Sequence, residues 1–552
     1  MGDSFTNFSY ALPYSSQRQP VFGESVVATS QPLAAQAGLE MLRRGGTAAD
    51  AAVATAAAMT VLEPTSNGIG SDAFALVWDG ERVHGLNASG HSPADLTPER
   101  FAGKDSMPNA GWDPVNVPGA VSGWVALWKK FGTLTFAELF EPAIRYARDG
   151  FLVAPLTAEL WARASTFKRY TSNPEWSRVF TINGRAPKAG ERIKFPDHAT
   201  TLASIASTEG ESFYRGDIAA KIAAAAKTDG GLLSSDDLAA HHADWVTPIS
   251  TAYHGVRLHE IPPNGQGIVA LMALSMLRSR DLRQLEPDCP DAVHLAVEAM
   301  KLAFAEAHRE VADSRFMKMT VEELLDGARL SELAKRIDMA KAQDFNHGPP
   351  KRGGTILLCA ADSEGRMVSF IQSNYEGWGS GVVIPGTGIA MHNRGANFTL
   401  AKGHPNEVGG GKRPYHTIIP GLVTSDASSD SGQLAVGKIA PQRGLMAFGV
   451  MGGFMQPQGH VQTLLRMVDH HWNPQAALDA PRWQVSEGLK LDIEPGFRPE
   501  IYAELRRRGH EIKIADARGV SFGRGQAIVR LEAAKGYVAG SDLRADGQAV
   551  AR

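Results

Sequence analysis

Hydrophobic and polar positions near the start of the chain predict short strands alternating with helices. Residues 25–29 read as a strand, and residues 32–44 read as a helix that ends at a Gly-Gly pair, which suits a left-handed cap. Thr47 then serves as an N-cap, with Asp50 in the first turn of a second helix. That helix carries small residues on all faces, which predicts burial or close packing against a sheet.

Paired apolar runs indicate two hairpins. Residues 66–72 form a Gly-rich turn that leads into an apolar run over residues 73–80, which pairs with residues 81–87. Further along, residues 355–361 and 367–373 are both apolar, and the turn DSEG separates them. Because neither run alternates clearly with polar residues, we expect this second hairpin to be buried on both faces, as between two layers.

The strongest break in the pattern is residues 344–354, DFNHGPPKRGG, whose two prolines and three glycines predict an exposed loop. The clearest helix runs from Asp291 to about Arg315, and the residues up to 24 read as a loose arm. After about Gly449 we expect a Gly-rich turn, a helix and two or three strands. These elements are compatible with a layered α/β sandwich, although the pattern does not fix the strand order.

Composition narrows the class of protein. The 552 residues are 43% hydrophobic and 21% charged, as in ordinary globular proteins, and the length suggests three or four domains. A net charge of −3 favours neither nucleic-acid nor membrane binding. The two cysteines, Cys289 and Cys359, lie far apart, so we expect no disulfide framework and a cytoplasmic setting. Neither a secretory signal nor an apolar run long enough to span a membrane is found.

Thr355 follows a Gly-Gly pair and opens a buried strand. The simple interpretation is structural, because threonine is common in strands. The chemical alternative is self-cleavage, in which the Thr355 hydroxyl attacks the carbonyl of Gly354, a residue without a Cβ that tolerates a strained backbone. The product would carry a free α-amine beside the hydroxyl. With an ordinary pKa of about 8, that amine can act as the base for its own hydroxyl.

Several segments, in order over roughly 500 residues, favour the chemical alternative. They are VVATSQPLAAQAGLEMLRRGGTAADAAVATAAAMTVLEPTSNGIGSDAFALVW, TILLCAADSEGRMVSF, GSGVVIPGTGIAMHNRGANF, GKRPYHTIIPGLV and VMGGFMQPQGH. The chain thereby resembles the γ-glutamyltransferase family of N-terminal-nucleophile hydrolases. The resemblance implies an α+β fold, a four-layer αββα sandwich with a helical elaboration in its N-terminal part. It also implies cleavage between Gly354 and Thr355 into a large fragment, 1–354, and a small fragment, 355–552, which together form one catalytic unit.

The resemblance assigns roles to individual residues. Thr355 stands where the family has its nucleophile, and Ser373 where it has a threonine that hydrogen-bonds the nucleophile. Gly452 and Gly453 stand where backbone N–H groups form the oxyanion hole, and glycines suit this role because they let the backbone approach the oxyanion closely. A plain turn is the alternative interpretation of that glycine pair.

The residues expected to hold the substrate depart from the family pattern. The stretch NASGHSP, which contains Ser89 and His91, has no arginine where the family clamps the glutamyl carboxylate. Asn397 stands where the family has a carboxylate that binds the amine, and His416 and Thr417 stand where it has a pair of serines. Tyr375 stands in place of an asparagine, and Arg394 in place of a glutamine. Each lost charge-assisted bond costs on the order of 1.5–3 kcal/mol, so selection for glutamyl groups should nearly vanish.

This altered set resembles a subgroup that contains oxamate amidohydrolase. Arg394 is then a hypothetical clamp for the carboxylate of a small anionic amide such as oxamate. A structural ion pair is an equally good interpretation of that arginine. Two further alternatives remain for the chain, namely a γ-glutamyl hydrolase or transferase acting on glutathione or γ-glutamyl amides, and an uncleaved, non-enzymatic relative.

No cofactor and no metal is expected. The adjacent pairs His241-His242 and His470-His471 do not converge on one ion. Residues 519–523 fit G-x-S-x-G, but a strand-like segment follows where that motif needs a helix, so a turn is the better interpretation. The expected partners are a small amide substrate and the two fragments of one precursor, and a homodimer with a second copy of the chain is a further hypothesis.

Overall fold

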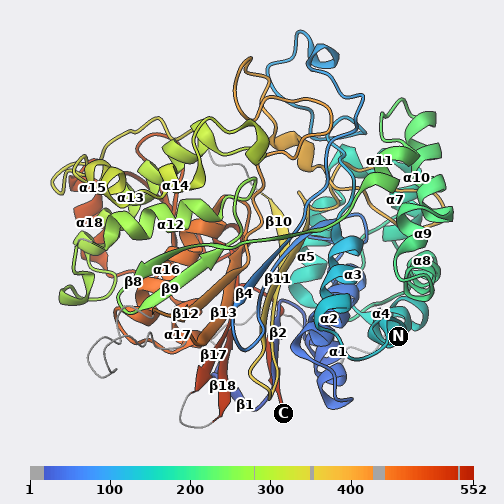
Figure 1. Ribbon diagram of the computed structural model, residues 1–552, viewed down its shortest axis with the longest axis horizontal. Coiled ribbons are helices and arrows are strands. Elements are labelled where there is room, and N and C mark those ends of the chain that lie inside the picture. Colours follow the sequence, from blue (N-terminus) through green and yellow to red (C-terminus); the bar gives the residue numbers. More distant parts are fainter. Residues whose placement is uncertain (1–17, 279, 349–352, 427–441, 532–534) are drawn as a thin grey trace, which may run out of the picture.

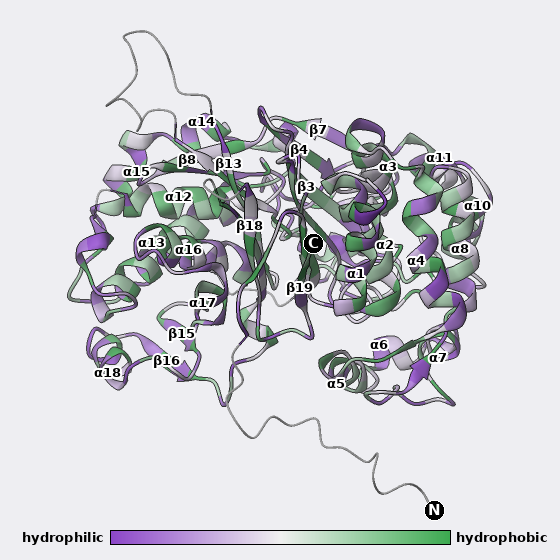
Figure 2. Cartoon of the chain, turned by 90° about the horizontal axis from the view of Figure 1, so that it is seen from below, coloured by the Kyte–Doolittle hydropathy of each residue, from purple (hydrophilic) through white to green (hydrophobic). Residues whose placement is uncertain are grey.

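The computed structural model describes residues 18–278, 280–348, 353–426, 442–531 and 535–552. Helices and antiparallel sheets occur together along this chain, which confirms the α+β class. In Figures 1 and 2 the strands of the two large sheets lie between two groups of helices.

The first sheet holds seven strands, and the predicted hairpin around Thr355 lies at its centre. Its order is β19 (Gln548–Ala551), β2 (Val26–Thr29), β10 (Gly354–Ala361), β11 (Met367–Tyr375), β3 (Asp72–Trp78), β4 (Val83–Ala88) and β7 (Asp244–Val246). Both predicted hairpins are confirmed, since β10 pairs with β11 and β3 pairs with β4, each antiparallel. Strands β10 and β11 are buried almost throughout, as expected.

The second sheet also holds seven strands and packs face to face with the first. Its order is β1 (Val21–Gly23), β18 (Gly536–Ser541), β17 (Arg524–Leu531), β13 (Gly444–Met451), β12 (Gly421–Ser425), β9 (Val256–Glu260) and β8 (Ile249–Tyr253). A continuous apolar cluster fills the space between the sheets, with Phe74 and Leu357 from the first and Ile528 from the second. The two central strands β10 and β13 are thereby held against each other.

Helices cover the outer face of each sheet. On the first sheet lie α1 (Pro32–Arg43), α2 (Ala48–Leu62), α3 (Ala120–Phe131) and α4 (Phe136–Asp149). On the second lie α12 (Gly267–Leu277), α13 (Pro290–Glu310), α16 (Met455–Val468) and α17 (Pro474–Asp479). Every residue of α2 is buried, and Thr47 and Asp50 form a capping box at its start, which confirms both predictions for that helix.

The remaining elements decorate these layers. In the N-terminal part they are η2 (Pro98–Phe101), β5 (Phe151–Leu152), α5 (Pro155–Ala164), α6 (Lys168–Thr171), α7 (Pro174–Phe180), β6 (Arg192–Ile193), α8 (Pro196–Ser207), α9 (Glu211–Tyr214), α10 (Asp217–Thr228) and α11 (Ser235–Ala240). Later come η3 (Leu282–Gln284), η4 (Ser314–Phe316), α14 (Val321–Leu324), α15 (Gly327–Ala334), η5 (Arg394–Asn397), β14 (Trp483–Val485), β15 (Lys490–Ile493), α18 (Pro499–Arg507), β16 (Glu511–Ile514) and η6 (Val520–Phe522). None of the helices in the described part combines the length and apolar character that a membrane span requires.

Several predicted boundaries were wrong. The expected N-terminal arm contains strand β1, which pairs with β18, while residues 1–17 lie outside the described part. The long helix ends at Glu310 and not near residue 315. In the expected exposed loop, residues 349–352 lie outside the described part, whereas Phe345 and His347 are buried. The C-terminal region has more helices and strands than predicted, because short strands with few alternating residues give a weak pattern.

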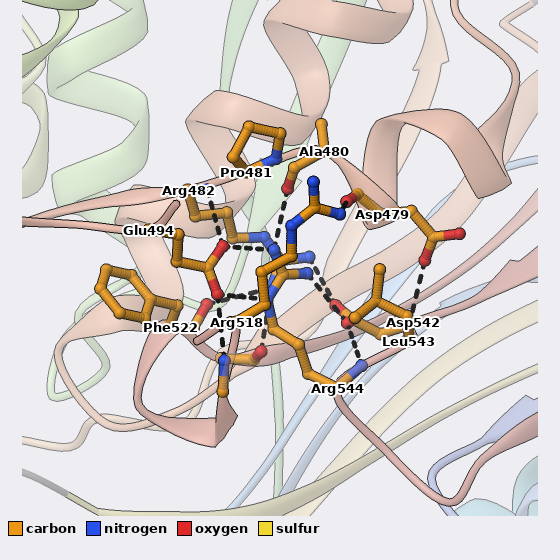
Figure 3. A network of polar contacts seen from close by, with 12 residues as sticks. Asp479, Ala480, Pro481, Arg482, Glu494, Arg518, Phe522, Asp542, Leu543 and Arg544 are labelled. Carbon is orange, nitrogen blue, oxygen red and sulfur yellow. Dashed lines mark hydrogen bonds and ion pairs between the residues drawn. The ribbon is translucent and has the colours of Figure 1, made fainter. Parts of the chain in front are cut away.

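A buried network of charges fixes the last turn before β17 (Figure 3). Arg482 pairs with Asp542 at 2.6 Å, and Arg544 pairs with both Asp542 and Glu494. The Arg482 guanidinium also donates to the carbonyls of residues 522 and 523 at 3.0 and 2.9 Å. This turn leads directly into Arg524, so the network holds one wall of the site described next.

Candidate active site

Thr355 lies at the start of β10, where the chain passes from a turn into the centre of the first sheet. The pairing register of β10 with β11 shifts between Gly354 and Ile356, which marks a local irregularity at Thr355. The Thr355 side chain is buried, and its hydroxyl donates to the Ser373 hydroxyl at 3.2 Å. The two residues that the family resemblance pairs therefore lie within hydrogen-bond distance.

Ser373 links this hydroxyl to the peptide bond that precedes it. Its hydroxyl donates to the carbonyl oxygen of Gly354 at 2.5 Å and accepts the backbone N–H of Tyr375 at 2.8 Å. A hydrogen bond to a carbonyl oxygen stabilises negative charge that develops there during attack. One serine hydroxyl thus contacts both the attacking group and the bond expected to break.

Gly452 and Gly453 lie between β13 and α16, close to the same peptide. Their φ angles of +140° and +61° fall in the left-handed region that favours glycine. A Cβ built on Gly353 would lie 3.4 Å from the Cα of Gly453, so the residue before Gly354 rests against this turn. Helix α16 begins at Met455, and the partial positive charge of its N-terminus favours an oxyanion here.

Arg524 holds the backbone of Thr355 from the second sheet. Its Nη2 donates to the Thr355 carbonyl at 3.2 Å and to the Ser66 hydroxyl at 3.1 Å, while its Nη1 pairs with Glu63 at 2.7 Å. Glu63 also accepts the Ser30 hydroxyl at 2.6 Å. Burial raises the pKa of Glu63, and the charge of Arg524 opposes that rise.

Sequence reasoning missed this contact. Glu63 and Ser66 lie inside the N-terminal segment that carries the family resemblance, and Arg524 directly follows the G-x-S-x-G stretch. That stretch forms the 3-10 turn η6 followed by strand β17, which confirms the turn interpretation. No sequence signal places Glu63 and Arg524 together, because they are 461 residues apart.

A cavity of about 300 Å³ opens beside Thr355. Thr355, Gly354 and Gly452 are among the residues that line it. The others come from the turn after α2, from α5 and α6 with the turn between them, from the residues just before β10 and just after β11, from β13 and β14, and from η6 and the start of β17: Thr65, Ser66, Leu160, Arg163, Ala164, Phe167, Arg169, Tyr170, Gly353, Glu376, Gly377, Met451, Gln484, Val520, Ser521 and Arg524. The cavity is large enough for part of a small-molecule substrate.

Arg394, the predicted carboxylate clamp, is buried in an ion pair. Its Nε donates to Asp72 at 3.1 Å, and its Nη1 donates to the Thr417 hydroxyl at 2.8 Å. The guanidinium also lies over the ring of Tyr375, 4.7 Å from the centroid. Its Nη2 has no hydrogen-bond partner among the described residues. Asp72 therefore offsets the charge of Arg394, and the buried guanidinium does not line the cavity at Thr355.

His416 belongs to the same group. Its Nε2 contacts Asp72 at 2.5 Å, and burial lowers the pKa of His416 to about 3, with Arg394 adding to the effect. Burial alone would raise the pKa of Asp72, but His392, His416 and Arg394 together hold it below its usual range. The Nδ1 of His416 accepts the backbone N–H of Ile418 at 3.4 Å, so its Nε2 is placed to donate to the Asp72 carboxylate.

Tyr375 connects this group to Thr355. It is the register partner of Gly354, and a Cβ on Gly353 would lie 3.4 Å from its ring. Its φ of +75° is unusual for a residue with a side chain and indicates local strain. Its hydroxyl is buried with no hydrogen-bond partner in the described part of the chain. One edge of the ring thus faces the cleavage segment, while Arg394 covers one face.

The other predicted substrate-binding residues, Asn397, Ser89 and His91, do not line the cavity at Thr355. Asn397 is buried, and both polar atoms of its side chain lack hydrogen-bond partners within the described ranges. Ser89 is buried and donates to Asn87 at 2.7 Å, and its carbonyl accepts Arg413 at 2.9 Å. Burial lowers the pKa of His91 to about 4, with Arg413 adding to the effect. Neither Ser89 nor His91 lines the cavity at Thr355.

One group of described residues has donor atoms close enough for a metal ion, namely His294, Glu298 and His510. These donors already bind one another and a lysine, since the two imidazoles lie 2.8 Å apart and Lys301 pairs with Glu298 at 2.8 Å. None of them lines the cavity at Thr355. The chemistry expected around Thr355 uses hydroxyl, amine and backbone groups.

Known proteins match this chain over nearly its full length. The Gamma-glutamyltranspeptidase family matches residues 34–552. A glutathione hydrolase-like YwrD proenzyme of Bacillus subtilis is 32% identical, covering 96% of this chain and 99% of its own, and an oxamate amidohydrolase proenzyme of Klebsiella pneumoniae is 35% identical, covering 90% and 93%. The solved structure of a cephalosporin acylase from Bacillus halodurans is 46% identical, with a TM-score of 0.92 and 99% of each chain covered.

These relatives share one kind of activity. They are named as hydrolases or acylases, and the curated ones are named as proenzymes. The family match confirms the resemblance carried by the ordered segments and shows that the chain is a hydrolytic enzyme made as a precursor. The chain belongs to the Gamma-glutamyltranspeptidase family of self-processing N-terminal-nucleophile hydrolases.

Proposed function

We propose that this protein cuts itself between Gly354 and Thr355 and then hydrolyses small anionic amides with Thr355 as the nucleophile. The observation that carries the proposal is the chain of hydrogen bonds from the Thr355 hydroxyl through Ser373 to the carbonyl of Gly354. The products would be the fragments 1–354 and 355–552, which share the two sheets. We assign these sheets and their helices to a four-layer αββα sandwich.

Self-cleavage follows from the positions of the three groups. The Thr355 oxygen attacks the carbonyl carbon of Gly354 while its proton passes to Ser373, and the Ser373 proton passes to the carbonyl oxygen. The C–N bond then breaks, the nitrogen takes up a proton, and an ester joins Gly354 to the Thr355 side chain. Water hydrolyses this ester, which leaves a carboxylate on Gly354 and a free α-amine on Thr355.

The same groups serve the mature reaction. The α-amine of Thr355 takes the hydroxyl proton as the oxygen attacks the substrate carbonyl, and it passes that proton to the departing amine. The backbone N–H groups at Gly452 and Gly453 would bind the oxyanion beside the N-terminus of α16. Arg524 keeps the Thr355 backbone in place during both steps.

The group around Arg394 supports a small anionic acyl half. The free Nη2 of Arg394 and the free hydroxyl of Tyr375 can donate to a compact carboxylate. Because Asp72 already offsets the charge of Arg394, binding would rest on these directed bonds more than on a net positive charge. The relative named as an oxamate amidohydrolase supports oxamate as the first substrate to test.

The alternative is a γ-glutamyl hydrolase or transferase, which the relative named as glutathione hydrolase-like supports. An α-amine on such a substrate would need an acceptor, and the neutral Asn397 offers only its amide oxygen. A γ-glutamyl anilide and oxamate assayed side by side separate the two functions. Faster turnover of the anilide would overturn the preference for a small anionic acyl group.

Self-cleavage has its own test. Denaturing electrophoresis of the purified protein should show bands of roughly 38 and 21 kDa, which share the 59.1 kDa chain in proportion to length. Thr355→Ala should give one uncleaved band, because no hydroxyl remains to attack Gly354. Cleavage of that variant, or an intact wild-type chain after long incubation, would contradict Thr355 as the self-exposed nucleophile. A cytoplasmic location and a homodimer are further parts of the proposal, checked by fractionation and by mass in solution.

A further inference from the structure

The polar groups near Thr355 differ in their access to solvent. Tyr375, Arg394 and Asn397 are buried, present unpartnered polar atoms and do not line the cavity at Thr355. The cavity itself reaches the surface, where Phe167 is 41% exposed and Arg163 is also exposed. In a reaction through an acyl-enzyme, the amine must leave and water must enter while the acyl group stays bound. The buried polar group therefore suits the acyl half, and the cavity that reaches solvent suits the departing amine.

The open cavity is too large for ammonia alone. Its volume is about 300 Å³. A molecule the size of water takes up about 30 Å³, and a cavity of about 150 Å³ holds a benzene ring. Leu160 and Ala164 from α5, together with Met451 and Val520 across the opening, give it apolar walls. These walls favour a flat apolar group of about the size of a substituted ring.

Arg163, an exposed residue of α5, adds a charge to the lining of this cavity. Two other arginines line the cavity, but Arg169 pairs with Glu376 at 2.5 Å and Arg524 pairs with Glu63 at 2.7 Å. No ion pair joins Arg163 to another residue in the described ranges. It is therefore available to an anionic group carried by a ligand that fills the cavity.

We propose that the cavity lined by Leu160, Arg163 and Phe167 binds the amine half of the substrate, and that this amine is aromatic and carries a carboxylate. The inference rests on the proposed function, because it assigns the leaving-group side of the same nucleophile. It changes the expected substrate from oxamate itself to an N-aryl oxamate. The amide C–N bond breaks, an oxalyl ester forms on Thr355, and the arylamine leaves with the proton carried by the α-amine.

Kinetics on three amides with one acyl group test this assignment. Oxamate releases ammonia, oxanilate releases aniline, and N-(4-carboxyphenyl)oxamate releases 4-aminobenzoate. Because aniline is intrinsically a better leaving group than ammonia, each rate is compared between variants and not between substrates alone. Phe167→Ala and Arg163→Gln should each lower kcat/KM for the carboxyphenyl amide by about fivefold or more, which corresponds to about 1 kcal/mol. Their effect on oxamate turnover should be much smaller, because oxamate has no aryl group.

Phe316→Ala and Arg148→Gln are matched controls, because both residues are exposed and lie outside the cavity. They should alter none of the three rates. Equal losses on all three amides in the Phe167 and Arg163 variants would overturn the assignment, as would no loss on any of them. A wild-type enzyme that hydrolyses oxamate but neither aryl amide would also overturn it.

A binding measurement separates this inference from the proposed function. The cavity is present in the uncleaved chain, so calorimetry on Thr355→Ala can measure the affinity of free 4-aminobenzoate without any turnover. We expect saturable binding that Arg163→Gln weakens by about fivefold or more. If 4-aminobenzoate binds but the wild-type enzyme hydrolyses none of the three amides, the proposed acyl group is contradicted and the amine site is retained. No binding to Thr355→Ala, or equal affinity in Thr355→Ala with and without Arg163→Gln, would contradict the amine site alone.

Discussion

The Ser373 hydroxyl donates to the Gly354 carbonyl oxygen at 2.5 Å, although the two residues are 19 positions apart. The antiparallel pairing of β10 with β11 brings them together, because it sets Gly354 opposite Tyr375. The same serine accepts the Thr355 hydroxyl, so in the proposed self-cleavage both attack and carbonyl activation would depend on one side chain. This relationship makes Ser373 the first residue to test in self-cleavage.

Ser373→Ala should slow self-cleavage by about 10²-fold, as expected when one hydrogen-bond donor to a developing oxyanion is removed. Ser373→Thr should restore most of the rate, since the hydroxyl returns and threonine is favoured in strands. The measurement is the time course of fragment appearance on a denaturing gel, with circular dichroism to check folding. Equal rates in the wild type and in Ser373→Ala would show that the serine only packs the strand.

The sequence predicted local features that depend on neighbouring residues. The capping box at Thr47, the hairpin of β10 and β11, and the meeting of Thr355 with Ser373 all follow from spacing, strand pattern or family segments. These predictions succeed because the determining residues lie within about 20 positions of one another.

The sequence did not predict contacts between distant segments or the partners of individual side chains. Glu63 and Arg524 meet from positions 461 residues apart, and nothing in either segment names the other. Arg394 was predicted to be equally suited to a ligand or to an ion pair, and the structure gives it Asp72 as a partner. A charged residue in a motif shows that a charge is needed, but only the fold shows which group offsets it.

Gly452→Ala should lower kcat strongly while the protein still folds. At a φ of +140° an alanine is strained, and its Cβ would lie 3.0 Å from the Cα of Gly523, so the turn must shift. A shifted turn moves the N–H groups expected to bind the oxyanion, with a loss of about 10²–10³ in kcat. Gly327→Ala is the control, because no atom lies within 4 Å of its added Cβ. Unchanged kcat in Gly452→Ala would remove this turn from the mechanism.

Arg524→Gln should destabilise the protein by about 3–5 kcal/mol, because it leaves Glu63 buried without its cation. Arg524→Lys should lose less stability, since a charge remains, but it should still slow self-cleavage because the directed bond to Thr355 is lost. Urea unfolding and the gel assay measure the two effects separately. If Arg524→Lys cleaves at the wild-type rate, Arg524 only stabilises the fold.

Arg394→Ala should raise KM for oxamate by about tenfold or more if its free Nη2 binds the carboxylate. The variant also leaves Asp72 buried without that partner, so KM is compared with the value for oxamide, a neutral amide of similar size. We expect the preference for oxamate over oxamide to vanish in Arg394→Ala and to return in part in Arg394→Lys. A preference that survives the change to alanine would leave Arg394 as an ion-pair partner only.

Buried neutral histidines should make the protein lose stability in acid. Burial lowers the pKa of His198 to about 4, and its ring packs against Phe180 and Phe195. As the pH falls below 6.5, the ordinary pKa of histidine, the His198 ring binds a proton in the unfolded chain. In the folded protein the ring binds that proton only near pH 4. Stability is therefore present above pH 6.5 and declines by about 1.4 kcal/mol per pH unit below it for this ring.

His198→Leu should reduce that decline by about 1.4 kcal/mol per unit, whatever it does to stability at pH 7. Urea midpoints measured between pH 7 and pH 5 give the slope directly. His242→Leu is the control, because its side chain is 75% exposed whereas His198 is buried. An unaltered slope in His198→Leu would mean that the buried ring takes up its proton in the folded protein.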